Sequence, residues 1–201
     1  MKNIIIAFVI ITAGLTACNN DKSKTEETTT KEHEHDDSGM APHEHTDTTV
    51  EKSVSVAFPV KEIIAGYLQL KNALAKDNTN DAATGGNAVV ASLATVDIKS
   101  LSKEQMKSYM DIADDMKEHA EHVGANAGKI EHQREHFEML SKDMADLVKT
   151  FGNGGQTLYR DFCPMANDGK GAIWISEVKE IKNPYLGSKM PNCGSIKETI
   201  K

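Results

Sequence analysis

The sequence predicts a mainly α fold, a four-helix up-and-down bundle followed by a small C-terminal segment of β-hairpin and loop. Between residues 59 and 151, apolar side chains recur at alternating steps of three and four, the spacing that places them on one helix face. From residue 157 onward, short apolar runs alternate with Gly, Asn and Asp, which is typical of strands and turns. Short connections between four amphipathic segments favour antiparallel neighbouring helices.

The first two expected helices lie between Pro59 and residue 96. Pro59 suits a first helical turn because its φ is already helical, and Asp77-Asn78 ends the first helix. A glycine at position 86, on the apolar stripe of the second helix, predicts close approach of another helix. The two stripes are Val60, Ile63, Tyr67, Leu70 and Leu74, then Ala82, Gly86, Val89, Leu93 and Val96.

The third and fourth expected helices fold back on each other about the turn 124–128. Ser102 and Gln105 have the spacing of a capping box, which opens the third helix. The glycine-rich run 152–155 stops the fourth helix. Their stripes are Met106, Tyr109, Ala113, Met116, Ala120 and Val123, then Ile130, Gln133, Phe137, Leu140, Met144, Leu147 and Phe151.

The C-terminal segment predicts a hairpin that packs on the bundle. Residues 158–162 and 172–175 are short apolar runs, and the turn-rich sequence 167–171 lies between them. Trp174 and Tyr185 are expected to be packing anchors rather than ligand platforms.

Residues 1–17 have the order of a secretory signal peptide. Lys2 precedes the apolar run 4–11, and small residues then lead to Cys18. This arrangement resembles the lipobox of bacterial lipoproteins, which implies that Cys18 carries the lipid. The alternative is an ordinary signal peptide. We therefore expect a protein held to the membrane by its lipid anchor in the cell envelope, facing the periplasm. Asn19, in place of Asp, favours the outer over the inner membrane.

Residues 18–52 have almost no large apolar side chains and predict a disordered, His- and acid-rich tether to the folded domain 53–201. Imidazoles alternate with carboxylates in it and favour weak binding of divalent copper, zinc or nickel; the alternative is an acidic linker with incidental histidines. The tether histidines are His33, His35, His43 and His45. The net charge of −7 disfavours a nucleic-acid partner.

Two histidine pairs mark the third and fourth helices. His119 and His122 are three residues apart, His132 and His136 four, so each pair shares a helix face. If the two helices pair about the turn 124–128, His119 faces His136 and His122 faces His132. Four imidazoles could then hold a copper or zinc ion. The alternative is a solvated helix face, and Arg134 and Glu135 are interpreted as ordinary solvated residues.

A second donor set lies in the C-terminal segment. Cys163 and Met165, with Met190 and Cys193, supply two thiols and two thioethers, which favour monovalent copper or silver. The alternative is a structural Cys163–Cys193 disulfide, since these two form an even pair in an oxidising compartment once Cys18 is assigned to the anchor.

Several spaced motifs resemble one family of uncharacterised envelope domains. The motifs are 163–166, 171–176, 180–187, Met190 with 193–194, and 132–137 with 140–141. Members of that family occur as lipoproteins or fused to periplasmic adaptors of heavy-metal (copper/silver) efflux pumps. The resemblance implies heavy-metal handling and a connection with an efflux system, and it implies no established activity.

These observations favour a metal-binding lipoprotein that buffers or delivers copper, with zinc or silver as the alternative ion. The rival hypothesis is a scaffold or interaction lipoprotein with a structural disulfide, whose bundle docks on an efflux complex or another envelope protein. No phosphate loop, nucleophile elbow or zinc-protease motif occurs, so no enzyme is expected.

Overall fold

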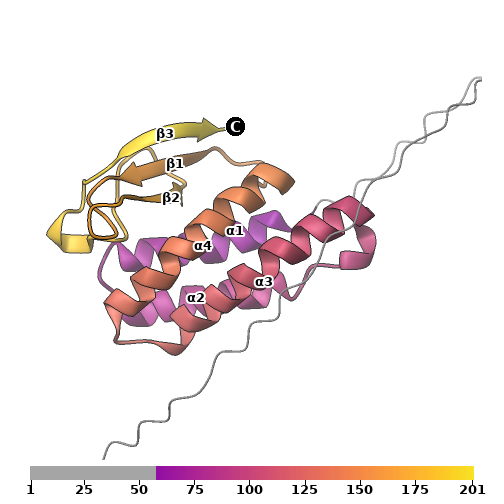
Figure 1. Ribbon diagram of the computed structural model, residues 1–201, viewed down its shortest axis with the longest axis horizontal. Coiled ribbons are helices and arrows are strands. Elements are labelled where there is room, and N and C mark those ends of the chain that lie inside the picture. Colours follow the sequence, from indigo (N-terminus) through magenta and orange to yellow (C-terminus); the bar gives the residue numbers. More distant parts are fainter. Residues whose placement is uncertain (1–57) are drawn as a thin grey trace, which may run out of the picture. The chain divides into compact units, whose positions relative to one another are not determined.

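The computed structural model describes residues 58–201, and in that part four α-helices precede a three-stranded sheet (Figure 1). The helices are α1 (Val60–Leu74), α2 (Thr79–Leu93), α3 (Lys103–Ala125) and α4 (Ile130–Phe151). Each helix packs on the next, and α1 also contacts α4, which closes the bundle. The strands are β1 (Leu158–Cys163), β2 (Ala172–Ser176) and β3 (Ser195–Ile200). The predicted fold class is confirmed.

Local capping explains where two of the helices begin. The Asn78 side chain accepts a hydrogen bond from the Asp81 N–H at the start of α2. Ser102 and Gln105 form the predicted capping box of α3. One boundary was wrong: α2 ends at Leu93, so Val96 lies in the connection to the short 3₁₀ helix η1 (Ile98–Ser100) and only packs partly against the core.

The core runs through the bundle and continues beneath the sheet. Gly86 lies against α3 as predicted, since a Cβ there would be 2.8 Å from the Ala120 carbonyl oxygen. Trp174 and Tyr185 are buried in this core, as expected of packing anchors. The largest fully buried apolar side chains include Tyr67, Ile63, Leu70, Met116, Phe137, Leu140, Met144 and Trp174.

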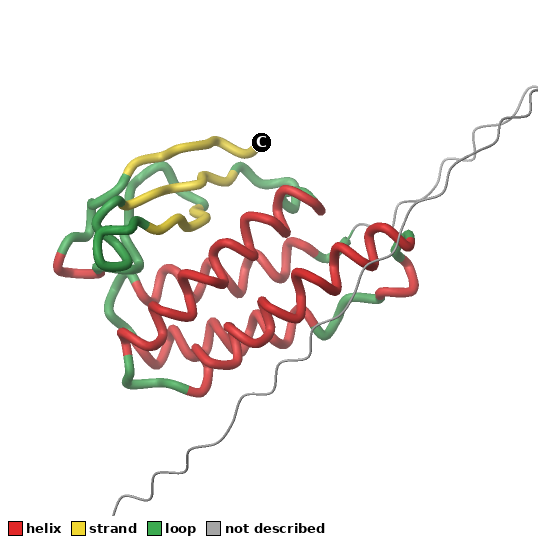
Figure 2. Tube along the Cα trace, in the orientation of Figure 1, coloured by secondary structure: helices red, strands yellow, loops and turns green. Residues whose placement is uncertain are grey.

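The sheet has the order β2-β1-β3 and lies along α1 and α4, away from α2 and α3 (Figures 1 and 2). The β1–β2 hairpin is the predicted one, whereas β3 was missed. Residues 195–199 are exposed, so this edge strand has no apolar pattern and depends on backbone pairing with β1. Phe162 pairs with Ser195, which brings the end of β1 beside residue 193.

Polar side chains attach the C-terminal segment to the bundle. The Tyr67 hydroxyl accepts the Ile175 N–H at 3.1 Å, and buried Lys71 pairs with Glu177 at 2.7 Å. Arg134 donates to the carbonyl oxygens of Pro184 and Leu74, at 2.9 and 3.2 Å. These contacts hold the C-terminal segment against α1 and α4, and α4 carries two of the candidate site residues.

The predictions for Cys18, His33, His35, His43 and His45 fall outside the described residues. Among the helices of residues 58–201, none combines the length and apolar character that crossing a membrane requires.

Candidate metal centre

The hairpin of α3 and α4 is held in register by Gln133, which is fully buried. Its side-chain amide donates to the Val123 carbonyl at 3.1 Å and to the Thr79 carbonyl at 3.0 Å. The first bond joins the end of α3 to the start of α4. On the flank of this hairpin the ring centroid of His122 is 6.1 Å from that of His132, the partner that the sequence numbering predicted, and only 4.2 Å from that of His136.

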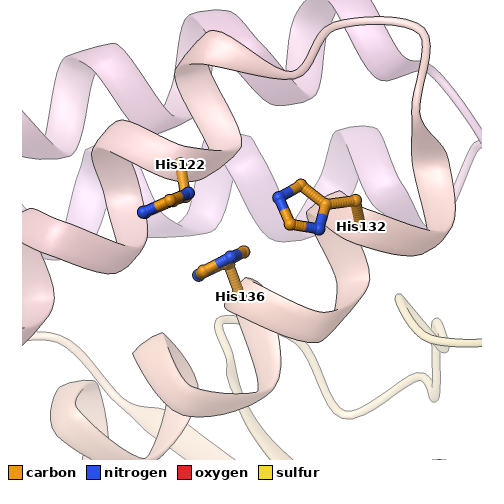
Figure 3. Close-up of side chains that lie close together, drawn as sticks. All are labelled: His122, His132 and His136. Carbon is orange, nitrogen blue, oxygen red and sulfur yellow. The ribbon is translucent and has the colours of Figure 1, made fainter. Parts of the chain in front are cut away.

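Three imidazoles converge on this flank. His122, His132 and His136 each offer a ligand atom, and these atoms lie within 4.8 Å of one another. In residues 58–201 they are the one such group of three or more His, Cys, Asp or Glu side chains. Figure 3 shows the rings around a common space, His122 from α3 and the other two from α4. We call these residues the histidine triad.

The rings of the histidine triad also contact one another. His122 and His136 are stacked, with centroids 4.2 Å apart and planes at 4°, while His132 meets the His136 ring nearly edge-on at 4.7 Å. Zinc–imidazole bonds of about 2.0–2.1 Å place nitrogens roughly 3.4 Å apart in a tetrahedral site. A metal lies in the plane of each imidazole that binds it, so one of the two stacked rings, His122 or His136, has to turn before both can bind the same ion.

His119 lies beside the triad rather than in it. Its Nδ1 is 3.4 Å from Nδ1 of His136, and the two ring centroids are 5.6 Å apart. The structure therefore brings three of the four predicted imidazoles together, and the fourth, His119, contacts only His136 among them.

The electrostatic surroundings favour neutral imidazoles next to negative charge. Burial lowers the pKa of His119. Burial also lowers the pKa of His136, and the neighbouring histidines His122, His132 and His119 act in the same direction. The carboxylate of Glu135 lies 3.2 Å from Nδ1 of His132. Unprotonated nitrogens near carboxylates suit a cation, because metal ligation requires neutral imidazole.

One sequence interpretation of this region was wrong. Arg134 is 6% exposed, although it was expected to be a solvated residue. The Pro184 carbonyl accepts one of its hydrogen bonds and Gly187 lies against its guanidinium, so its burial depends in part on the C-terminal segment. Glu135 is exposed as expected, but its contact with His132 was not anticipated. A carboxylate three residues after a histidine on a helix was the available sequence clue.

The sulfur donors come together only in part. Cys163 is buried at the end of β1, Cys193 is half-buried, and the two thiols are free. A hydrogen bond to Cys163 raises the pKa of the Cys193 thiol, and burial raises it further. Met165 and Met190 are 54% and 39% exposed. Whether the cysteines bind metal or form a disulfide stays a prediction.

A surface pocket lies on another face of α4. It has a volume of about 410 Å³, and both Glu135 and Met165 line it. Glu135 thus links the two candidate donor sets, since it also contacts His132 of the triad.

Residues 63–156 match an uncharacterised domain family. Its description is "Protein of unknown function (DUF3347)". The matched segment includes most of the helical bundle and all four histidines of the flank, and it stops before β1 and the two cysteines. The searches of curated proteins and of solved structures returned no match.

Proposed function

We propose that this protein is a non-catalytic, lipid-anchored metal-binding protein of the cell envelope, which buffers or delivers copper on the periplasmic side. The observation that carries the proposal is the histidine triad. Three imidazoles suit divalent copper, zinc or nickel, and divalent copper binds most tightly to a given nitrogen site among the first-row ions.

The position of the triad supports exchange of the ion rather than permanent storage. His122 is exposed, and His132 and His136 are half-buried, so the donors are reachable from solvent. A structural zinc site is usually closed by four protein ligands, whereas a site with three ligands leaves a position for water or an incoming donor. The tether histidines would add a weak second collection site.

The connection with heavy-metal efflux rests on the resemblance of the tail motifs to the envelope-domain family. An efflux system or another envelope protein is the proposed partner, and the lipid on Cys18 would hold the domain at the membrane. Several acyl chains on one Cys give firm attachment, because each buried methylene contributes about 0.8 kcal/mol.

Metal titration of the full chain in detergent tests the triad. The tether histidines are first replaced by alanine so that they do not contribute. On that background we expect one equivalent of Cu²⁺ or Zn²⁺ to bind in competition with a chromophoric chelator. His132→Ala with His136→Ala should weaken binding at least about 100-fold, because loss of two of three ligands removes the site.

A matched double variant on the exposed face of α3 controls for surface charge. Lys107 and Asp111 form an exposed ion pair at 3.0 Å, away from the triad, and their replacement by alanine should leave the affinity unchanged. Equal affinity in the double histidine variant and this control would overturn the proposal.

The scaffold hypothesis has one observation in its favour, the mutual contact of the Cys163 and Cys193 thiols. Counting free thiols on metal-free protein taken from the envelope separates the alternatives. No free thiol supports a structural bridge. Two free thiols, with binding of Cu⁺ that is lost in Cys163→Ser with Cys193→Ser, support a soft-metal site in the tail.

A further inference from the structure

We propose that His119 and Glu135 are positioning residues that hold the Nδ1 protons of His136 and His132, so that both triad histidines present Nε2 to the metal. This inference rests on the proposed metal site. It assigns His119 a place outside the coordination shell, in contrast to the four-ligand arrangement that the sequence alone allows.

Glu135 determines the proton position on His132. An ionised carboxylate only accepts hydrogen bonds, so the 3.2 Å contact requires a proton on Nδ1 of His132. A neutral imidazole carries one proton, and Nε2 is therefore left with a free lone pair. In Figure 3 the His132 ring extends from α4 toward His122 and His136. The Nε2 lone pair is therefore directed into the space between the three rings, where a metal would bind.

His119 acts in the same way on His136. Their Nδ1 atoms are 3.4 Å apart, and a hydrogen bond between them needs a proton on one and a lone pair on the other. If His119 donated, His136 would carry its own proton on Nε2 and could not bind metal there. The metal-competent arrangement therefore has His136 donating from Nδ1 to His119.

The location of His119 agrees with this role. Its nitrogens do not belong to the group within 4.8 Å, which contains the triad alone. Acceptors for the second ring nitrogen of ligating histidines are a recurrent feature of metal sites, and their removal lowers affinity 10- to 100-fold. Here the acceptors are one carboxylate and one imidazole, both on the same hairpin.

The metal-free protein provides the first test. Long-range ¹H–¹⁵N spectra of the full chain at pH 8 distinguish the two neutral tautomers of each histidine. We expect Nδ1–H for His132 and His136. The pattern at His136 should be kept in His119→Asn, because the amide oxygen stands near the position of Nδ1 and accepts the same bond. It should change toward Nε2–H in His119→Ala.

Metal binding provides the second test, on the background without tether histidines. His119→Ala should lower Cu²⁺ affinity about tenfold, and His119→Asn should restore most of it. The nitrogen hyperfine pattern of bound Cu²⁺ should show three imidazoles in the unsubstituted protein and in both variants. Glu135→Ala should cost less than His119→Ala, since the Glu135 side chain is 71% exposed and its contact is screened.

The possible outcomes separate the two claims. An Nε2–H tautomer at His132 or His136 would overturn this inference and leave the metal site in place. The same holds if bound Cu²⁺ has four nitrogen ligands in the unsubstituted protein and three in His119→Asn. Absence of metal binding in the unsubstituted protein would overturn the proposed function and the ligand assignment with it, even with the expected tautomers.

Discussion

Two faces of helix α4 use polar side chains in opposite ways. On one face, Arg134 is buried and donates hydrogen bonds to Pro184, Leu74 and Asp77, so its partners belong to the fold. On the other, His132 and His136 lie next to His122 and point into the space between them. Polar side chains whose hydrogen bonds are accepted inside the protein hold its parts together. Imidazole nitrogens that face one another are instead available to bind a ligand. The first face should govern stability, and the second metal affinity.

The largest expected effect is on the Arg134 face. Arg134→Ala should lower the free energy of unfolding by about 3–5 kcal/mol, because the hydrogen bonds of its buried guanidinium to Pro184, Leu74 and Asp77 are lost together. Arg160→Ala is the matched control. Its ion pair with Glu198 is exposed, and the change should be at most about 1 kcal/mol. Denaturant titration measures both, and equal losses would break the comparison.

The next effect concerns pH and buried Asp161. Within the described part of the chain neither carboxylate oxygen has a hydrogen-bond partner, and burial raises the pKa of Asp161 to about 6. As pH rises, the unfolded chain releases this proton near the ordinary pKa of an Asp carboxyl, whereas the folded chain releases it only near pH 6. The free energy of unfolding therefore falls as pH rises from about 4 to 6. Asp161→Asn should reduce this fall by up to about 3 kcal/mol. Denaturation at several pH values measures it; an unchanged profile would contradict the assignment.

The histidine flank should have the opposite pH dependence. The lowered pKa values of His119 and His136 mean that the unfolded chain takes up protons first as pH falls through the ordinary value of about 6.5. Stability contributed by these neutral rings is therefore present above that pH and lost below it. His119→Ala with His136→Ala should flatten the decline in unfolding free energy between pH 7 and 5. A slope identical to that of the unsubstituted protein would contradict this.

A smaller loss is expected at the Tyr67 hydroxyl. Tyr67→Phe removes the acceptor of the buried Ile175 N–H and the partner of the Ser141 hydroxyl, and should cost about 1–3 kcal/mol. Tyr159 is also buried, but its hydroxyl makes no such bond within residues 58–201, so Tyr159→Phe should cost less than about 0.5 kcal/mol. Thermal unfolding of the two variants provides the comparison.

The smallest stability effect should be that of the metal ligands themselves. Without metal, His132→Ala with His136→Ala should change the free energy of unfolding by no more than about 0.5 kcal/mol per site, as is usual for surface positions. Added Zn²⁺ should raise the unfolding temperature of the unsubstituted chain and leave that of the double variant unchanged. A large loss without metal would show that these histidines hold the fold.

Sequence reasoning succeeded where the relevant contacts are local. The helix periods predicted the bundle, and pairing α3 with α4 about a short turn predicted that histidines of the two helices lie near one another. It did not predict that His122 stacks on His136. It failed for Arg134, which stands between His132 and His136 in an acidic, polar stretch. Periodicity alone cannot show that residues fifty positions later cover this side chain. The edge strand β3 was missed for a related reason, since its pairing with β1 leaves no apolar pattern.

Amino-acid order alone therefore determined the helices, the hairpin of α3 and α4, and the candidate donors, because side chains three or four residues apart share a helix face. Tertiary structure decided which donors meet. It placed three imidazoles in one group with His119 behind them, and it brought two thiols thirty residues apart into contact. Distances of a few ångströms depend on how helices and strands pack, and packing is a property of the whole domain.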